Sequence, residues 1–391
     1  MTSGSNPSIG FVSTYPPTVC GIASYTASLV ETLTNQYPLI RLGVVSLSHD
    51  PRGKSDPPVV FRHRTGDRRS LRTAVRVLNT YDTVSIQHEF GIFGGQDGSE
   101  VIPLMLGLKV PTTVTLHTVL SEPLPNQRSI TETMCDLAAR IVVMSETAAS
   151  RLVDRYGVDP QRISVIPHGA DRDFAGPSLS EGDRPLLMTW GLIGPGKGLE
   201  WAIQALAGLI DMEPLPRYLI AGATHPNVRK ESGEAYRASL ISLTDRLGLG
   251  QVVEFEDRYF ERPDLARLVR SADLVILPYE SVEQVTSGVL VEAIGASKPV
   301  IATPFPHAVE LLSGGAGAIV PFNEPSALGA RLRQILSNPS ARSLMTDTAS
   351  RLAADRYWPT IGARFAAMMM EVRYSRQPRV LVTDVRHRAA G

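Results

Sequence analysis

The sequence is poor in the features that mark several large classes of protein. It has only two cysteines, Cys20 and Cys135, among 391 residues, too few for a disulfide framework or a cysteine-rich metal site. No apolar run approaches the roughly 20 residues that a membrane-spanning helix needs. The first ten residues have neither the basic start nor the apolar core of a signal peptide. We therefore expect a cytoplasmic protein, with membrane association limited to a peripheral contact at the inner face.

An excess of charge of one sign is also missing. Lysine and arginine total 39, aspartate and glutamate total 39, so the net charge offers no overall case for binding nucleic acid. The G-x-G-x-x-G fingerprint and the G-K-[ST] ending of a Walker A loop are absent, which disfavours a dinucleotide-dependent oxidoreductase and a P-loop enzyme. The hydrophobic content of 43% is ordinary for a globular chain, and the length suits two domains.

Short apolar runs alternate with amphipathic helical patterns through both halves of the chain. This alternation predicts the α/β class, with two Rossmann-like domains built on parallel sheets. We place the first domain at residues 1–170, a polar linker at 171–184 and the second domain at 185–356. Within the second domain the pattern predicts one polar helix from about residue 229 to residue 247.

The most informative stretch, residues 276–304, reads ILPYESVEQVTSGVLVEAIGASKPVIATP. Its apolar start predicts a buried strand, and its apolar stripe predicts a helix that opens near Thr286-Ser287-Gly288. Unpaired N–H groups and the helix dipole attract anions to such a start. Glu292 lies further along this helix, where its carboxylate can accept hydrogen bonds from sugar hydroxyls.

A glycine-rich turn opens the second domain after the apolar run of residues 186–190. It begins at Gly191, contains Lys197 and leads into a helical pattern. Backbone that approaches closely and an ammonium that neutralises charge make a phosphate-binding design. The loss of Lys197 would remove a charged hydrogen bond worth roughly 1.5–3 kcal/mol. The alternative is a surface lysine in a turn.

In the first domain, ionisable residues follow two strands. His88 and Glu89 follow the apolar run of residues 83–87, and His117 follows that of residues 110–116. Ligands bind at the carboxyl ends of strands in open α/β sheets, so these residues are candidates for contact with a ligand. The alternative is that each histidine is simply packed or exposed. No metal-ligand spacing accompanies them, so we expect neither a metal nor a cofactor.

Two other features of the first domain have competing explanations. Gly21, after the first strand, either lets the backbone approach a phosphate or only permits a tight turn. Arg68, Arg72 and Arg76 share one face of a helix predicted from about residue 67 to residue 79. A solvated helix face is the favoured explanation. The alternative is a surface for anionic lipid or a phosphorylated acceptor.

The stretch at 276–304 resembles the donor site of the retaining GT-B glycosyltransferases, in particular glycosyltransferase family 4. The family pattern is Glu, seven residues, Glu, then A-x-x-x-G-x-P-V-I-A-T. Its second half is matched here by Glu292, Ala293, Gly295 and the run Lys298-Pro299-Val300-Ile301-Ala302-Thr303. The first Glu of the pattern falls on Gln284, and Glu283 stands one place early. Either a neutral amide fills the first position or Glu283 does so in a slipped register.

The resemblance extends to the glycine-rich turn and to the end of the chain. Lys197 matches the lysine of the family loop G-R-l-x-x-x-K-G, whereas Leu192 stands where arginine is usual. The resemblance implies the GT-B fold, two domains that face a cleft, and a helix at residues 357–375 that crosses back to the first domain. The tail at residues 376–391 has no counterpart in the pattern.

By this resemblance the chain transfers a hexosyl unit, mannose or glucose, from a nucleotide-diphosphate sugar to an acceptor hydroxyl with retention. The resemblance implies a sugar, a glycan or a lipid-linked acceptor, and no metal. The implied catalytic residues are His117, Lys197 and Glu292. The implied donor-binding residues are Gly21, Gly191, Lys197, Gln284, Thr286, Ser287, Gly288 and Glu292. The implied acceptor-side residues are His88, Glu89 and His117.

Other activities on the same fold remain open at this point. One is a sugar-nucleotide epimerase or a phosphorylase. Another, kept open by Gln284 and Leu192, is a catalytically silent protein that binds a sugar nucleotide. Release of nucleotide that depends on an acceptor would separate transfer from epimerisation, and dependence on phosphate would reveal a phosphorylase.

Overall fold

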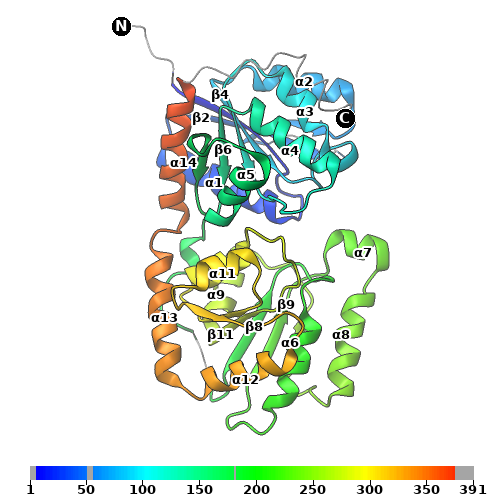
Figure 1. The fold of residues 1–391 in the computed structure, drawn as a ribbon, viewed down its shortest axis with the longest axis vertical. Helices are drawn as coiled ribbons and strands as arrows, with labels where there is room; N and C mark the ends of the chain where they lie inside the picture. The colour runs from blue at the N-terminus through cyan, green and yellow to red at the C-terminus, as the bar shows by residue number, and fades with distance from the viewer. Residues whose placement is uncertain (1–5, 51–55, 180–181, 375–391) are drawn as a thin grey trace. The chain divides into compact units, whose positions relative to one another are not determined.

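The computed structural model describes residues 6–50, 56–179 and 182–374. The chain divides into two compact units (Figure 1). Unit 1 contains the residues up to His168 and those from Trp358 onward, and unit 2 contains Gly169–Tyr357. Each unit is built on one parallel sheet with helices on its faces, as the alternating pattern predicts.

The sheet of unit 1 has the strand order β3-β2-β1-β4-β5-β6-β7, with parallel neighbours throughout. The strands are β1 (Ser8–Ser13), β2 (Arg41–Ser48), β3 (Val59–Arg64), β4 (Thr83–His88), β5 (Thr112–Leu116), β6 (Arg140–Val143) and β7 (Ile163–Val165). The order reverses between β1 and β4. The carboxyl ends of these two strands therefore form the switch point at which open α/β sheets bind ligands.

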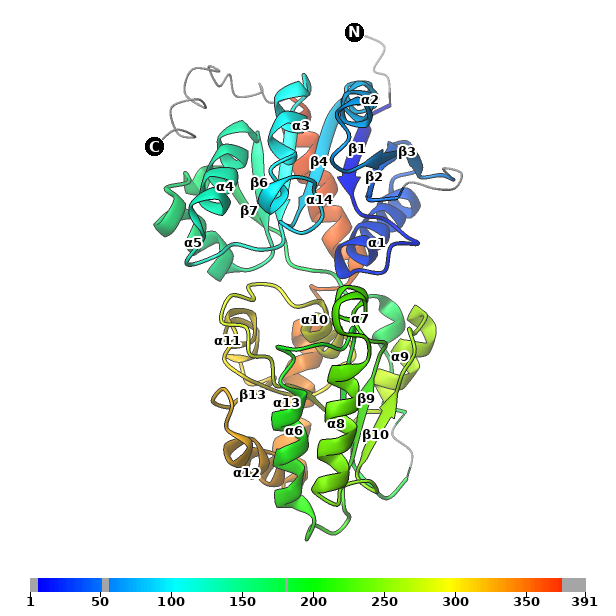
Figure 2. The ribbon, with the colours of Figure 1, turned by 90° about the vertical axis from the view of Figure 1, so that its right-hand side faces the viewer.

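The helices of unit 1 come from both ends of the chain. They are α1 (Gly21–Gln36), α2 (Arg68–Leu78), α3 (Val101–Gly107), α4 (Pro125–Leu137), α5 (Glu146–Tyr156) and α14 (Trp358–Arg373), with the 3₁₀ turns η1 (Gln96–Gly98) and η2 (Pro160–Arg162). The C-terminal helix α14 packs beside α1 (Figure 2). Its fully buried Phe365 stacks on Phe11 of β1 with ring centroids 6.0 Å apart. The expected crossing of the last helix back to the first domain is thus present.

Unit 2 repeats the same sheet plan. Its strand order is β10-β9-β8-β11-β12-β13, again parallel, with the switch point between β8 and β11. The strands are β8 (Leu186–Trp190), β9 (Arg217–Ala221), β10 (Val253–Glu256), β11 (Leu274–Leu277), β12 (Val300–Ala302) and β13 (Gly317–Ile319).

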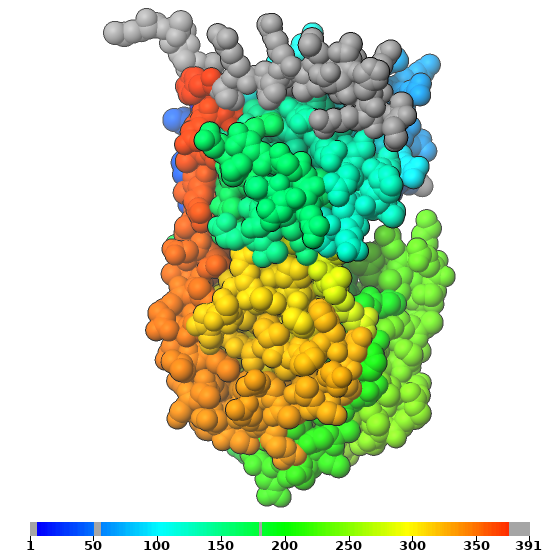
Figure 3. All heavy atoms as spheres, viewed as in Figure 1, coloured from blue at the N-terminus to red at the C-terminus, as the bar shows by residue number. Residues whose placement is uncertain are grey.

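Helices cover both faces of this second sheet. They are α6 (Leu199–Leu206), α7 (Pro226–Ser232), α8 (Ala235–Arg246), α9 (Arg262–Ser271), α10 (Gly288–Gly295), α11 (Pro306–Leu312), α12 (Pro325–Leu336) and α13 (Pro339–Ala353), with the turns η3 (Arg172–Phe174) and η4 (Ala207–Leu209). Helices α6 and α8 run side by side (Figure 2). On the face shown in Figure 3, much of the surface of unit 2 is formed by the yellow and orange segments, which include α11 and α12.

Strand β11 shows why its sequence is apolar without interruption. Val275 and Leu277 belong to the core cluster on one side of the sheet, and Leu274 and Ile276 belong to the cluster on the other side. A parallel strand with helices over both faces has no solvent side, so polar residues do not alternate along it.

Several local features differ from what the sequence pattern predicts. The helix expected at residues 229–247 is two helices, α7 and α8, because Gly233 at φ 62° leaves the helical conformation between them. The sequence pattern predicts neither strands β3 and β13 nor helix α3. The segment expected as a linker includes η3, whose Phe174 is 2% exposed and lies in the core of unit 2. The tail at residues 376–391 lies outside the described residues.

Candidate functional site

Glycines allow close backbone packing between the loops that follow β8, β9 and β11 in unit 2. A Cβ on Gly222 would lie 1.9 Å from the carbonyl oxygen of Gly191, and a Cβ on Gly198 would lie 1.9 Å from that of Pro278. Both glycines have positive φ, 146° and 62°, which side chains other than glycine adopt at a cost. Gly191 itself has φ 111° and donates its N–H to the Ala221 carbonyl oxygen at 3.0 Å. The glycine-rich turn is therefore held at the switch point of the sheet.

Lys197 lies in this turn, partly buried. Its Nζ lies 4.1 Å from the centroid of the Tyr279 ring, in the residues that follow β11. Burial lowers the pKa of Lys197 to about 8. Within the described part of the chain no carboxylate forms an ion pair with it. A cation that has lost water and has only an aromatic face beside it is well prepared for an anionic ligand.

Glu292 on α10 is the second ionisable group at this edge. Its Oε2 accepts a hydrogen bond of 2.9 Å from the indole N–H of Trp190, the last residue of β8. Burial raises the pKa of Glu292 to about 7, although the Trp190 hydrogen bond acts in the opposite direction. The side chain keeps part of its surface exposed. Its remaining acceptor positions can therefore receive hydrogen bonds from a ligand.

The start of α10 differs in one respect from the sequence-based expectation. Ser287 caps the helix, since its Oγ accepts from the N–H of Leu290 at 3.2 Å. Its own N–H donates to Nδ1 of His307 at 2.8 Å. The Ser287 amide is therefore engaged inside unit 2, and the expectation that it binds a diphosphate is corrected.

Other donors remain at this helix start. The first N–H groups of α10, those of Gly288 and Val289, precede the intrahelical ladder. The buried hydroxyl of Thr286 has no hydrogen-bond partner among the described residues. These three groups replace the Ser287 amide as candidates for contact with a phosphate.

The structure also places the residues of the family pattern that lie just before and just after α10. The pattern A-x-x-x-G, counted from Ala293, puts its glycine at Ser297, so the earlier assignment to Gly295 is wrong. Ser297 has φ 55°, a conformation that favours glycine and explains the residue type of the pattern. Gln284 and Glu283 both lie partly exposed in the loop before α10.

In unit 1, Gly21 is the first residue of α1. The Sγ of Cys20 caps the helix by accepting from the N–H of Ala23 at 3.4 Å. A Cβ placed on Gly21 meets no described atom within 4 Å. Packing within the chain therefore does not demand glycine here.

His117 directly follows β5 and is partly exposed. Its Nε2 bonds to Oε1 of Gln87 at 3.0 Å, while the Gln87 amide nitrogen faces the hydroxyls of Ser85 and Thr115. This network assigns the proton to Nε2 and leaves Nδ1 as an acceptor. Burial lowers the pKa of His117 to about 3, with smaller contributions from His168 and His88. The imidazole is therefore neutral over the physiological range.

His88 and Glu89 end β4 differently. His88 is fully buried, with its ring stacked on Phe93 and edge-on to Phe90. It therefore supports the loop and does not present its ring at the surface of unit 1. Glu89 is partly exposed, and its carboxylate accepts from the Thr118 hydroxyl and the Phe90 N–H. Burial raises the pKa of Glu89.

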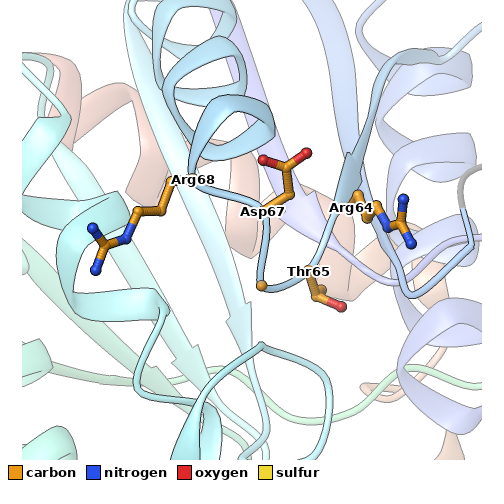
Figure 4. Close-up of a pocket in the computed structure, with 5 residues that line it drawn as sticks. Arg64, Thr65, Asp67 and Arg68 are labelled. Atoms are coloured by element: carbon orange, nitrogen blue, oxygen red, sulfur yellow. The ribbon is translucent and has the colours of Figure 1, made fainter.

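A shallow hollow lies at the start of α2, lined by Arg64, Thr65, Gly66, Asp67 and Arg68. Figure 4 shows the two guanidinium groups pointing away from each other, with the Asp67 carboxylate between them. Groups that diverge in this way do not form a closed anion site. Further along α2, Arg72 and Arg76 are exposed like Arg68, as expected for residues on one helix face.

The structure adds partners that sequence reasoning missed. Trp190 holds Glu292, Tyr279 covers Lys197, and Gln87 orients His117. Trp190, Tyr279 and Gln87 all lie at or just after the carboxyl end of a strand, and this position in the sequence could have identified them. Among the described residues there is no group of three or more histidine, cysteine, aspartate or glutamate side chains arranged to hold a metal. None of the described helices is long and apolar enough to cross a membrane.

Two α/β units, each built on a parallel sheet whose strand order reverses at a switch point, have the architecture of the GT-B fold. Solved structures agree. Sucrose-phosphate synthase from Thermosynechococcus elongatus superposes with a TM-score of 0.75 at 18% identity, over 94% of this chain and 99% of that one. Anabaena HepE, in complex with UDP and glucose, superposes with a TM-score of 0.71 at 17% identity, over 93% and 100%.

Family comparisons go further. Residues 19–174 match the model of Glycosyltransferase Family 4, and residues 171–351 match that of Glycosyl transferases group 1. The chain belongs to the group 1 glycosyltransferases and is family 4-like.

Curated relatives are similar over part of their length. A D-inositol 3-phosphate glycosyltransferase of Kineococcus radiotolerans is 29% identical over 64% of this chain and 63% of the relative. One of Mycobacterium sp. (strain KMS) is 32% identical over 54% and 50%. The matched region thus spans less than two thirds of the length of these relatives.

Proposed function

We propose that this protein transfers a hexosyl unit, glucose or mannose, from a nucleotide-diphosphate sugar to an acceptor hydroxyl, with retention and without a metal. The observation that carries the proposal is the pair of ionisable groups at the switch point of unit 2. Lys197 is a partly buried cation without a carboxylate partner in the described chain, and Glu292 is a partly buried carboxylate held by Trp190.

The chemistry of the leaving group supports this assignment. When the glycosidic bond breaks, negative charge builds on the diphosphate, and preorganised donors in a low-dielectric site stabilise it. Lys197, the Thr286 hydroxyl and the amides of Gly288 and Val289 are donors of this kind. Glu292 then accepts hydrogen bonds from the ribose hydroxyls.

On the acceptor side, His117 offers a neutral imidazole whose Nδ1 can accept a hydrogen bond. We assign it to the positioning of the donor sugar or the acceptor hydroxyl, with Glu89 beside the same strand ends. The acceptor hydroxyl attacks the anomeric carbon from the same face that the leaving group departs from, and this retains the anomeric configuration. We therefore assign no enzymic nucleophile. Gly21 is assigned to the diphosphate through its backbone.

The choice of substrates to test first comes from the relatives. HepE was solved with UDP-glucose as well as with UDP and glucose, so UDP-glucose leads the donor panel. The curated relatives are named for D-inositol 3-phosphate, so phosphorylated polyols lead the acceptor panel, followed by sugars and lipid-linked sugars.

Calorimetry with GDP-mannose, UDP-glucose, UDP-N-acetylglucosamine and ADP-glucose tests the donor site. One donor should bind, and Lys197→Ala should weaken it by about 10- to 100-fold, since a charged hydrogen bond contributes roughly 1.5–3 kcal/mol. Lys230→Ala, at an exposed lysine of α7, is the matched control and should leave the affinity unchanged. Failure of every nucleotide sugar and nucleoside diphosphate to bind would refute the site.

Product analysis separates the alternatives. Nucleotide release that requires an acceptor supports the transferase, release without one supports an epimerase, and dependence on phosphate supports a phosphorylase. Binding of a donor without turnover over the whole acceptor panel supports a silent binding protein, the alternative that Gln284 in the first position of the pattern keeps open.

We also propose that the exposed face of α2 contacts anionic lipid. Arg68, Arg72 and Arg76 are exposed on this face, and each arginine near an anionic surface contributes about 1 kcal/mol. Replacement of all three with glutamine should release the protein from phosphatidylserine vesicles in a flotation assay. The double variant of Lys230 and Arg246 to glutamine, in unit 2, should not. Equal binding of the wild type and the triple variant would leave α2 with an ordinary solvated face.

A further inference from the structure

Tyr25 of α1 stands at the centre of an aromatic cluster in unit 1. The residue is 2% exposed. Its ring centroid lies 4.9 Å from that of His117, 5.1 Å from that of His168 and 5.2 Å from that of Trp358. The ring planes of Tyr25 and His117 are nearly perpendicular, at 88°. Tyr25 therefore forms an edge contact with the imidazole that we assign to the acceptor side.

His168 and Trp358 occupy special places in the chain. His168 is the last residue of unit 1 before the chain enters unit 2, and Trp358 is the first residue after it returns. Their rings lie 5.6 Å apart, and both contact Tyr25. One tyrosine ring thus touches both crossing segments and His117.

His117 is oriented by two contacts made at different parts of its ring. Gln87 bonds to Nε2 at 3.0 Å, and the Tyr25 ring lies against it from α1. A single hydrogen bond leaves an imidazole free to swing about its side-chain torsions. The second contact restricts that swing and excludes water from one side of the ring.

The hydroxyl of Tyr25 does not explain these contacts. It is buried and has no hydrogen-bond partner among the described residues. A buried hydroxyl without a partner costs free energy. Phenylalanine would keep the ring contacts without that cost, which makes the substitution a clean test of what the ring does.

We propose that Tyr25 is a positioning residue, whose ring holds the His117 imidazole against Gln87 and links it to the two segments by which the chain leaves and re-enters unit 1. The effect on turnover rests on the role proposed above for His117. The effect on the imidazole itself does not, and it can be measured without any substrate.

The first test is a titration of the histidine rings by NMR on ¹⁵N-histidine-labelled protein. In the wild type, His117 should stay neutral down to pH 5, since burial and the neighbouring His168 and His88 lower its pKa. Tyr25→Phe should behave in the same way. Tyr25→Leu should admit water, so that the pKa of His117 rises towards the ordinary value of about 6.5.

The control is a buried aromatic residue of the same core that does not touch His117. Phe365→Leu, on α14, removes a fully buried ring that stacks on Phe11. It should lower the melting temperature and leave the His117 titration unchanged. If Tyr25→Leu does not fold, Tyr25→Met replaces it, because the unbranched side chain adapts to irregular space.

The second test uses turnover with the donor and acceptor found in the panels above. Tyr25→Leu should lower kcat about tenfold with an unchanged donor KM, and Tyr25→Phe should restore kcat to within twofold. A His117 titration unchanged in Tyr25→Leu and Tyr25→Met overturns the proposal. An equal fall in kcat for Tyr25→Phe and Tyr25→Leu also overturns it, since the hydroxyl would then be responsible. If no acceptor is found, the NMR result alone decides.

Discussion

The carboxyl edges of the two sheets, each with a switch point, are alike in topology and differ in electrostatics. In unit 2, Lys197 and Glu292 each bring an ionisable group into a partly buried place without an ion-pair partner among the described residues. In unit 1, His117 is held neutral by burial and bonded to the uncharged Gln87, and Glu89 is bonded to a hydroxyl and an amide.

This difference follows from what each edge is proposed to bind. A diphosphate needs positive charge and N–H donors, and the desolvation of a lone cation is offset when the anion arrives. A sugar hydroxyl needs oriented neutral acceptors. We therefore expect changes in unit 2 to alter donor affinity and stability, and changes in unit 1 to alter turnover.

The largest expected effect concerns Glu292. Its folded pKa of about 7 lies above the ordinary 4.5 because of burial. Between these values the folded state holds the proton more tightly than the unfolded state, so stability is lost as the pH rises towards 7. Glu292→Gln lacks this penalty. Its stability advantage over the wild type should grow by about 3 kcal/mol from pH 4.5 to pH 8, measured by urea unfolding. Glu371→Gln, at an exposed position of α14, should show no such growth.

Next in size is His117→Ala. Turnover should fall about 100-fold, because a group that fixes the geometry of the reacting atoms is lost. The donor dissociation constant, measured by calorimetry, should stay within twofold of the wild type, since the charged groups assigned to the diphosphate and the ribose, Lys197 and Glu292, lie in unit 2. If His117→Ala also lowers donor affinity about 100-fold, the proposal that unit 2 sets donor affinity and unit 1 sets turnover is wrong.

A smaller effect is expected from the pH dependence of donor binding. The pKa of Lys197 is lowered to about 8 by burial, so its charge is lost above that pH. Donor affinity should fall about tenfold from pH 7.5 to pH 9.5 in the wild type. Lys197→Arg should bind with a flat profile over this range, because guanidinium stays protonated. If donor affinity depends on pH in the same way in the wild type and in Lys197→Arg, Lys197 does not contact the diphosphate.

The smallest effect concerns the backbone after α10. Ser297 adopts φ 55°, where a side chain is strained, so Ser297→Gly should stabilise the protein by about 0.5–1 kcal/mol in thermal unfolding. Asn323→Gly, at φ 56°, is the control and should gain less, because asparagine tolerates this conformation. A loss of stability in Ser297→Gly would mean that the serine makes a contact worth more than the strain.

The fold class could be predicted because most of the alternating strands and helices show their own apolar periodicity in the local sequence. The break at Gly233 was missed because a single glycine is tolerated within a helix, and the sequence does not show that this one adopts φ 62°. The contacts that define the candidate site are of another kind. Trp190 and Glu292 are 102 residues apart and meet only because β8 and β11 are neighbours. Gln87 and His117 meet in the same way through β4 and β5. The order of the strands in the sheet determines which distant residues meet, and hydrophobic periodicity does not reveal that order.

The return of the chain to unit 1 has a consequence for biosynthesis. The ribosome completes every residue of unit 2, Gly169–Tyr357, before it makes α14. Until then, the first sheet lacks the side chains of Trp358, Ile361 and Phe365 that fill its core beside α1. Unit 2 can therefore finish folding before unit 1, although most of unit 1 is synthesised earlier. Until α14 is made, the nascent unit 1 keeps an apolar face exposed.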